Sequence, residues 1–217
     1  MKQIFVNLET LPDIDGARLM FELPAELQDT DVAKVLFHQH VSTRGRDKIF
    51  LQPWQARIAV VCVIVISDAD AELFSFDIPQ SDEVELLQKL YEFLNCSTDS
   101  FCWDQGRDLN ALLQIRSMIH ELKFDATPLR TVEQRLRMQP GSNSLEAIAA
   151  RFGLQGIAMQ GDELSWKLYR QHGIDPLSKR CRTNVIATAQ LGLRHLLTTG
   201  KIDRQRFNQL AAACGEL

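Results

Sequence analysis

The stretch IFVNLETLPD, residues 4–13, determines how the rest of the chain is interpreted. Apolar residues lead into Asn7, Leu8, Glu9 and Thr10, a pattern that predicts a β-strand. Side chains alternate between the two faces of a strand, so Asn7 and Glu9 share one face. Two oxygen-bearing side chains that project together from a first strand are typical of half of a metal site. One of the two, however, is an amide and not a carboxylate.

Further strand patterns predict a sheet around this first strand. IAVVCVIVI (58–66) is β-branched and apolar at almost every position, as expected for a strand buried on both faces at the centre of a sheet. ELFSFDI (72–78) follows a turn-rich link and is interpreted as a hairpin partner, and SFCW (100–103) as a short strand. These strands alternate with helical patterns, which favours an α/β or α+β layered domain.

Helical patterns occupy much of the remaining chain. Residues 81–95 have a helical stripe with Ser81 as the expected N-cap, and residues 108–122 form a second amphipathic pattern. Residues 125–144 are irregular and are interpreted as a connection. Three more helices are expected over 144–153, 162–173 and 177–199. Because no low-complexity linker interrupts the sequence, residues 1–217 are expected to form a single domain.

The composition is that of an ordinary globular protein. Of the 217 residues, 45% are hydrophobic and 24% charged, which excludes a disordered or disulfide-stapled chain. The net charge is -4, so no global basic field attracts nucleic acid or a membrane surface. The five cysteines are odd in number and include no C-x-x-C motif, and Cys62 lies in an apolar run as a small core residue would. This usage favours a reducing compartment, and a cytoplasmic location is expected. The longest apolar run is too short to cross a bilayer, so no membrane partner is expected.

One other short motif raises the question of a metal site. His38 and His40 stand two apart in HQH, but no third ligand stands nearby. Zinc sites use three or four protein ligands. A loop or edge-strand pair is therefore the expected interpretation.

Four segments, taken in chain order, are similar to the motifs of one known family. IFVNLETLPD (4–13) is similar to an opening motif hFDIETxPD, and WDQGRDLNALLQIRSMIH (103–120) to a second motif with an Asp that leads into a helix. SLEAIAARFGLQG (144–156) and RCRTNVIATAQLGLRHLLTTGKI (180–202) are similar to the segments that follow. The family is the DEDD-type 3′–5′ exonucleases, in the group related to the exonuclease domain of family-B DNA polymerases. The resemblance implies an α/β fold, a ribonuclease-H-like mixed sheet flanked by helices.

The resemblance also implies a chemistry. In that family four carboxylates hold two divalent ions, which assist the attack of water on a phosphodiester. The matching positions here are Asn7, Glu9, Asp108 and Asn184, so two of the four carboxylates are amides. An amide oxygen ligates Mg²⁺ without supplying charge. We therefore expect no bound cofactor, with Glu9 and Asp108 as weak metal ligands at most. If the protein is active, the ions would be Mg²⁺ or Mn²⁺.

The sequence departs from the family at further positions. Arg107 stands where the family has Phe, Arg180 where it has the Tyr that orients the water, and Ile157 where it has Lys. Asp-to-Asn changes are also how such a site is disabled experimentally, so an engineered double mutant is an alternative. The additional departures favour natural decay of the site.

Helical spacing makes a prediction about the arginines. Arg180 and Asn184 are four residues apart and share a helix face, whereas Arg182 points elsewhere. A guanidinium fits either a carboxylate or a phosphate, so Arg180 is expected to pair with Glu9 or Asp108, or to bind nucleic acid with Thr10 and Arg107. The structural pair is favoured, because the net charge gives no independent sign of nucleic-acid binding.

Three functions compete at this point. The first is an exonuclease-family protein with a degenerate two-metal site, inactive or weak, that binds single-stranded nucleic acid or a protein partner. The second is an active metal-dependent 3′–5′ exonuclease on single-stranded DNA or RNA. The third is a purely structural protein-interaction module. The loss of ligand charge favours the first and the third over the second.

Overall fold

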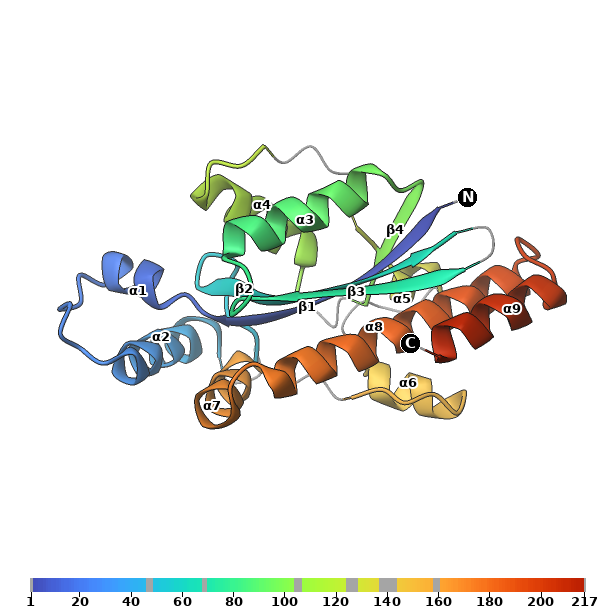
Figure 1. Cartoon of the computed structure of the whole chain (residues 1–217). Coiled ribbons are helices and arrows are strands. Elements are labelled where there is room, and N and C mark those ends of the chain that lie inside the picture. Colours follow the sequence, from blue (N-terminus) through green and yellow to red (C-terminus); the bar gives the residue numbers. More distant parts are fainter. Residues whose placement is uncertain are drawn as a thin grey trace.

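A mixed five-stranded sheet organises the part of the chain that the computed structural model describes (Figure 1). That part comprises residues 2–45, 49–67, 70–103, 107–123, 129–136, 144–157 and 161–216. The strands are β1 (Gln3–Pro12), β2 (Ala56–Ile66), β3 (Ala71–Asp77), β4 (Asp99–Cys102) and β5 (Arg130–Thr131). Their order in the sheet is β3-β2-β1-β4-β5. β1 pairs antiparallel with β2 and parallel with β4, so the predicted first strand lies at the centre.

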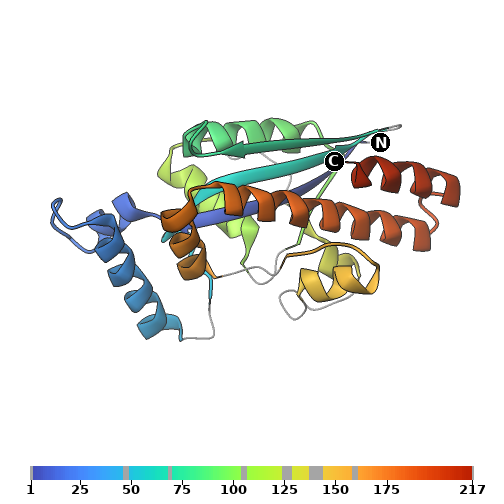
Figure 2. The ribbon, with the colours of Figure 1, turned by 60° about the horizontal axis from the view of Figure 1, so that its bottom comes forward.

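Helices cover both faces of the sheet. They are α1 (Ile14–Met20), α2 (Asp29–Arg44), α3 (Glu83–Asn95), α4 (Leu109–Ile119), α5 (Val132–Arg135), α6 (Leu145–Arg151), α7 (Asp162–His172), α8 (Asp175–Thr198) and α9 (Arg204–Gly215). Figure 1 shows α3 and α4 on one face and α7, α8 and α9 on the other. In Figure 2, α8 runs along the sheet with α9 beside it, while α1 and α2 extend from the end of β1.

The side chains of β1 alternate between the two faces of the sheet, so this strand contributes to two hydrophobic cores. Ile4, Val6 and Leu8 pack with the α3 and α4 side chains, whereas Phe5 and Leu11 belong to the core beneath α8. Odd-numbered residues of β1 therefore face α8, as period-two geometry requires. The register between β1 and β2 shifts between Glu9 and Thr10, and such bulges re-aim side chains locally.

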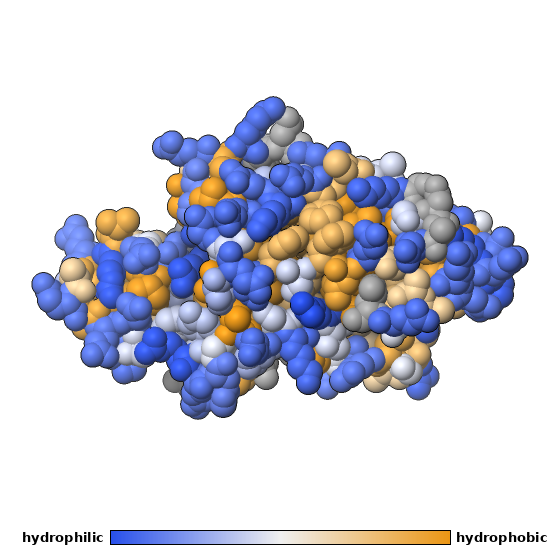
Figure 3. Space-filling model, in the orientation of Figure 1, coloured by the Kyte–Doolittle hydropathy of each residue, from blue (hydrophilic) through white to orange (hydrophobic). Residues whose placement is uncertain are grey.

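The edge of the sheet at β3 carries aromatic side chains. Phe74 and Phe76 pack against Phe93 of α3, with ring centroids 4.8 and 6.2 Å from that ring. Figure 3 shows an apolar area over β3 beside α3, within a mostly hydrophilic surface. The aromatic cluster shields one side of the edge strand, and Lys89 lies over the ring of Phe76.

The structure confirms most predicted elements and corrects three expectations. The N-cap of α3 is Asp82, whose carboxylate accepts the Glu85 N–H, and not Ser81. His38 and His40 lie on helix α2 and not in a loop or edge strand. The described part of 125–144 contains β5 and α5, so this stretch is more than an irregular connection. Helices α1, α2 and α9 were not predicted. None of the described helices has the length and apolar character needed to cross a bilayer.

Candidate functional site

Asn7 and Glu9 of β1 lie on the face that α8 covers. Asn7 is 2% exposed and Glu9 is fully buried. Both follow Phe5 on the odd-numbered face of the strand, as the alternation predicts. A carboxylate buried to this degree is costly unless a cation or several hydrogen bonds compensate it.

The guanidinium of Arg180 compensates the buried negative charge of Glu9. Its Nε donates to Glu9 Oε1 at 2.9 Å, and its Nη2 donates to Glu9 Oε2 at 2.6 Å. Nη2 also donates to Ser165 Oγ at 2.8 Å. Burial by itself lowers the pKa of Arg180, but the hydrogen bonds and charge of Glu9 outweigh it, so the pKa is raised. The predicted ion pair is thus confirmed, and Arg182 is exposed on another face of α8, also as predicted.

A second buried pair joins the loop before α4 to the start of α7. Arg107 Nη2 donates to Asp162 Oδ1 at 3.0 Å, with both side chains at most 4% exposed. Thr10 Oγ1 donates to the same oxygen at 2.6 Å, and the Leu51 N–H donates to Oδ2 at 2.7 Å. The guanidinium of Arg107 also lies 4.3 Å from the centre of the Phe50 ring. Sequence reasoning missed Asp162, whose only local signal is an acidic residue at a helix start.

The two asparagines make hydrogen bonds to neighbouring protein groups. Asn7 Nδ2 donates to Cys181 Sγ at 3.5 Å, and the Cys181 thiol donates to the Asn7 carbonyl at 3.2 Å. Asn184 Oδ1 accepts the Ile157 N–H at 2.9 Å. Burial raises the pKa of the Cys181 thiol well above its usual value, so this group is a neutral donor. Both amides act here as local hydrogen-bonding groups within the fold.

Asp108 has a different environment from Glu9. It is exposed and lies in the left-handed region, with φ 54°, as the N-cap of α4. Its carboxylate accepts the Ala111 N–H at 3.1 Å. This capping contact explains an Asp at this position without a metal.

The residues at the four family positions do not fit a two-metal centre. Both oxygens of Glu9 are bound by a guanidinium, Asn7 and Asn184 are uncharged, and Asp108 caps a helix. Within the described ranges, no group of three or more His, Cys, Asp or Glu side chains is arranged to hold a metal ion. Magnesium and manganese need several hard oxygen ligands, which this arrangement does not offer.

A separate polar cluster links the end of β1 to α3 and α4. Arg116 donates through Nε to Glu83 at 2.9 Å and through Nη1 to Asp13 at 2.5 Å. His120 Nε2 lies 2.9 Å from Glu83 Oε2. Burial lowers the pKa of Arg116, but the two carboxylates outweigh it and raise the pKa overall. With 2% exposure of Arg116, this cluster is a structural connection and not an open site.

Comparison with solved structures finds a similar fold in a much larger protein. The family B DNA polymerase from the hyperthermophilic archaeon Pyrobaculum calidifontis matches 91% of this chain with a TM-score of 0.54 and 12% identity. The chain spans about a quarter of that polymerase, 24% of its length. No protein-family profile and no curated protein matches the sequence. At this identity the similarity concerns the fold alone, and with the observed strand order it supports an α/β, ribonuclease-H-like mixed sheet flanked by helices.

Proposed function

We propose that this chain is a relative of the DEDD-type 3′–5′ exonucleases that does not hydrolyse phosphodiesters and acts by binding a partner. The observation that carries the proposal is the bidentate pair between Arg180 and Glu9. Two-metal hydrolysis needs ions that clamp the attacking and leaving oxygens. In this chain a guanidinium occupies both oxygens of the buried carboxylate that the family uses to hold such an ion.

The charge balance of the site supports the same conclusion. Glu9 and Asp162 are neutralised by Arg180 and Arg107, all four nearly or fully buried. The two buried pairs together have zero net charge, so they do not compensate the cost of dehydrating two dications, and Mg²⁺ dehydrates reluctantly. The positive charge that the ions would supply is already present as two arginines.

Natural loss of the metal site explains these contacts better than an engineered double mutant. Asn7 and Asn184 alone would disable the metal site without any need for arginines. Arg107 and Arg180, however, are each bound to a buried carboxylate, and one of these, Asp162, lies outside the family's four ligand positions. Removal of one partner from a buried ion pair is strongly destabilising. We therefore interpret the two arginines and their carboxylates as a joint replacement for the metal ions.

The contacts also bear on where a partner binds. Thr10, Arg107 and Arg180, the candidates for contacting nucleic acid, direct hydrogen bonds to protein side chains. Their polar groups lie inside the fold, with Arg107 7% and Arg180 4% exposed. We therefore place the binding surface outside the former metal site.

Nuclease assays on the purified chain test the proposal. With labelled single-stranded DNA or RNA and either Mg²⁺ or Mn²⁺, we expect no shortening of the substrate. The double variant Asn7→Asp with Asn184→Asp should also stay inactive, because Arg180 still occupies Glu9. Calorimetric titration with Mn²⁺ provides a readout independent of activity and should show no two-site binding. Robust degradation by the wild type would refute the proposal. Robust degradation by the double variant would show instead that only the two carboxylates were missing, and would favour the engineered double mutant over natural loss of the site.

A further inference from the structure

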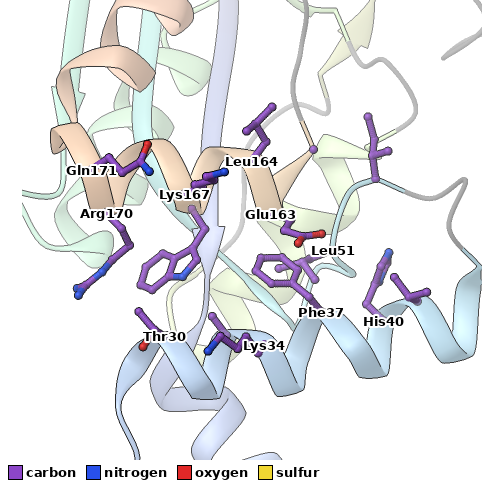
Figure 4. A pocket seen from close by; sticks show the side chains of 15 residues that line it. Thr30, Lys34, Phe37, His40, Leu51, Glu163, Leu164, Lys167, Arg170 and Gln171 are labelled. Atoms are coloured by element: carbon purple, nitrogen blue, oxygen red, sulfur yellow. The ribbon is translucent and has the colours of Figure 1, made fainter.

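A groove lies on the surface between α2 and α7 (Figure 4). Its volume is about 630 Å³, within the range of specific ligand sites. Phe37, Leu51 and Trp166 are among the apolar side chains that line it. Of the exposed large apolar residues, Ile49 at 52% and Leu164 at 44% also line this groove. The groove therefore offers an apolar surface to solvent at both its floor and its rim.

The floor of the groove is fixed by backbone contacts and is not a gap between loosely placed elements. The Asp162 N–H donates to the Ile49 carbonyl at 3.0 Å, and the Leu51 N–H donates back to the Asp162 carboxylate at 2.7 Å. A Cβ on Gly161 would lie 2.7 Å from the Ile49 carbonyl oxygen, so glycine permits this close approach. Segment 49–51 and the start of α7 are thus held together.

The charges along the groove are mostly positive. Lys34 of α2 and Lys167 and Arg170 of α7 line it, and among the lining residues that the structure describes Glu163 is the acidic one. Lys34 also pairs with Asp31 at 2.7 Å, an exposed contact of small strength. Figure 4 shows Arg170 and Lys34 near one end, by Thr30, and Glu163 beside Phe37 toward the other. The basic end of an apolar groove is complementary to a ligand with an apolar face and acidic flanks.

We propose that this groove binds an amphipathic helix of a protein partner, with acidic residues that face Lys34, Lys167 and Arg170. The proposal rests on the proposed function, for which it supplies the ligand. Helix-in-groove recognition uses apolar anchors at helical spacing in an apolar cleft, and α7 over its 11 residues is long enough to contact about three turns of a partner helix.

Single-stranded nucleic acid fits the groove less well. Base stacking uses exposed aromatic faces along a basic track. Trp166 is only 8% exposed, and the guanidinium of Arg170 lies 5.8 Å from the centre of its ring. Phe37 is the other aromatic residue among the described lining residues apart from His40, and the apolar remainder of that lining is aliphatic. The net charge of -4 gives no long-range attraction to a polyanion.

Three probes test the choice of ligand on the full-length chain. The first is a fluorescent peptide of about 16 residues with Leu at helical spacing and Glu on its flanks. The second carries Lys in place of Glu, and the third is a labelled oligothymidylate. We expect the acidic peptide to bind with a Kd of roughly 1–100 μM, the basic peptide to bind at least about tenfold more weakly, and the oligonucleotide not to displace the acidic peptide.

Matched variants locate the binding. Leu164→Asp and Lys167→Glu, both at the groove, should each weaken binding of the acidic peptide by about tenfold or more. Leu19→Asp, at an 83% exposed leucine of α1, and Arg182→Glu on α8 are the controls and should leave the affinity unchanged. Lys167→Glu should also strengthen binding of the basic peptide.

Several outcomes would overturn the proposal. These are no saturable binding of the acidic peptide, equal affinity for both peptides, equal losses in the groove and control variants, or displacement by the oligothymidylate. None of them changes the nuclease and Mn²⁺ measurements, so a failure of the groove proposal is distinguishable from a failure of the proposed non-hydrolytic function.

Discussion

Replacing Arg180 with Ala is the most direct test of the buried ion pair between Arg180 and Glu9. The side chains of Arg180 and Glu9 are 4% and 0% exposed, and two hydrogen bonds of 2.9 and 2.6 Å join them. The substitution removes both bonds together with the bond to Ser165. It also leaves a carboxylate inside the protein with no cation to balance it.

The size of the effect follows from this burial. Breaking a buried pair by removal of one partner costs roughly 3–5 kcal/mol, and the burial of Glu9 places this case within that range. For a domain of this length each kcal/mol lowers the Tm by about 2–4 °C. We therefore expect the Tm of Arg180→Ala, measured by calorimetry or circular dichroism, to fall by roughly 6–20 °C.

Two controls separate the ion pair from general effects of mutation. Arg182→Ala removes an exposed arginine from the same helix and should leave the Tm close to that of the wild type. Arg180→Met combined with Glu9→Gln removes both charges and should recover much of the loss, because uncharged replacements of a buried pair are often tolerated. If Arg180→Ala and Arg182→Ala lose equal stability, or if the double variant is less stable than Arg180→Ala, the reasoning is wrong.

Four further predictions concern α7 and the thiols. Asp162→Asn removes the charge that balances buried Arg107 and should cost about 3 kcal/mol in urea unfolding. Gly161→Ala introduces a Cβ with no room and should cost roughly 1–3 kcal/mol by the same assay. In the native protein Cys96, the exposed cysteine among the five, should react first with a thiol reagent. Burial raises the pKa of Cys214 to about 11, so its contribution to stability should be lost as pH rises from the unfolded value of 9.0 through 11.

The sheet was predictable because its signals are local. Period-two alternation in β1 and the unbroken apolar run of β2 specify strands without knowledge of the rest of the fold. β5 has only two residues, Arg130 and Thr131, too few for any periodic signal. Helix α2 buries Val32, Ala33, Leu36 and His40 in a narrow stripe, so its pattern does not stand out from a polar connection.

The site was predictable only where the relation between residues is local or carried by a motif. Spacing of four residues on one helix placed Arg180 with Asn184, and the motif order placed that helix face against Glu9. Asp162 bonds to Thr10 across 152 positions of sequence, and no periodicity or motif encodes that contact. The second buried arginine pair, between Arg107 and Asp162, therefore required the structure.

Helix α7 connects the two buried arginine pairs with the proposed binding groove. Asp162 and Ser165, three apart on its inner face, hold Arg107 and Arg180. Leu164 and Lys167, also three apart, line the groove on its outer face. Arg107 and Arg180 thereby fix the position of the helix that forms one wall of the groove. The proposed replacement of metal ions by arginines and the proposed docking surface are therefore linked, because Arg107 and Arg180 both contact α7.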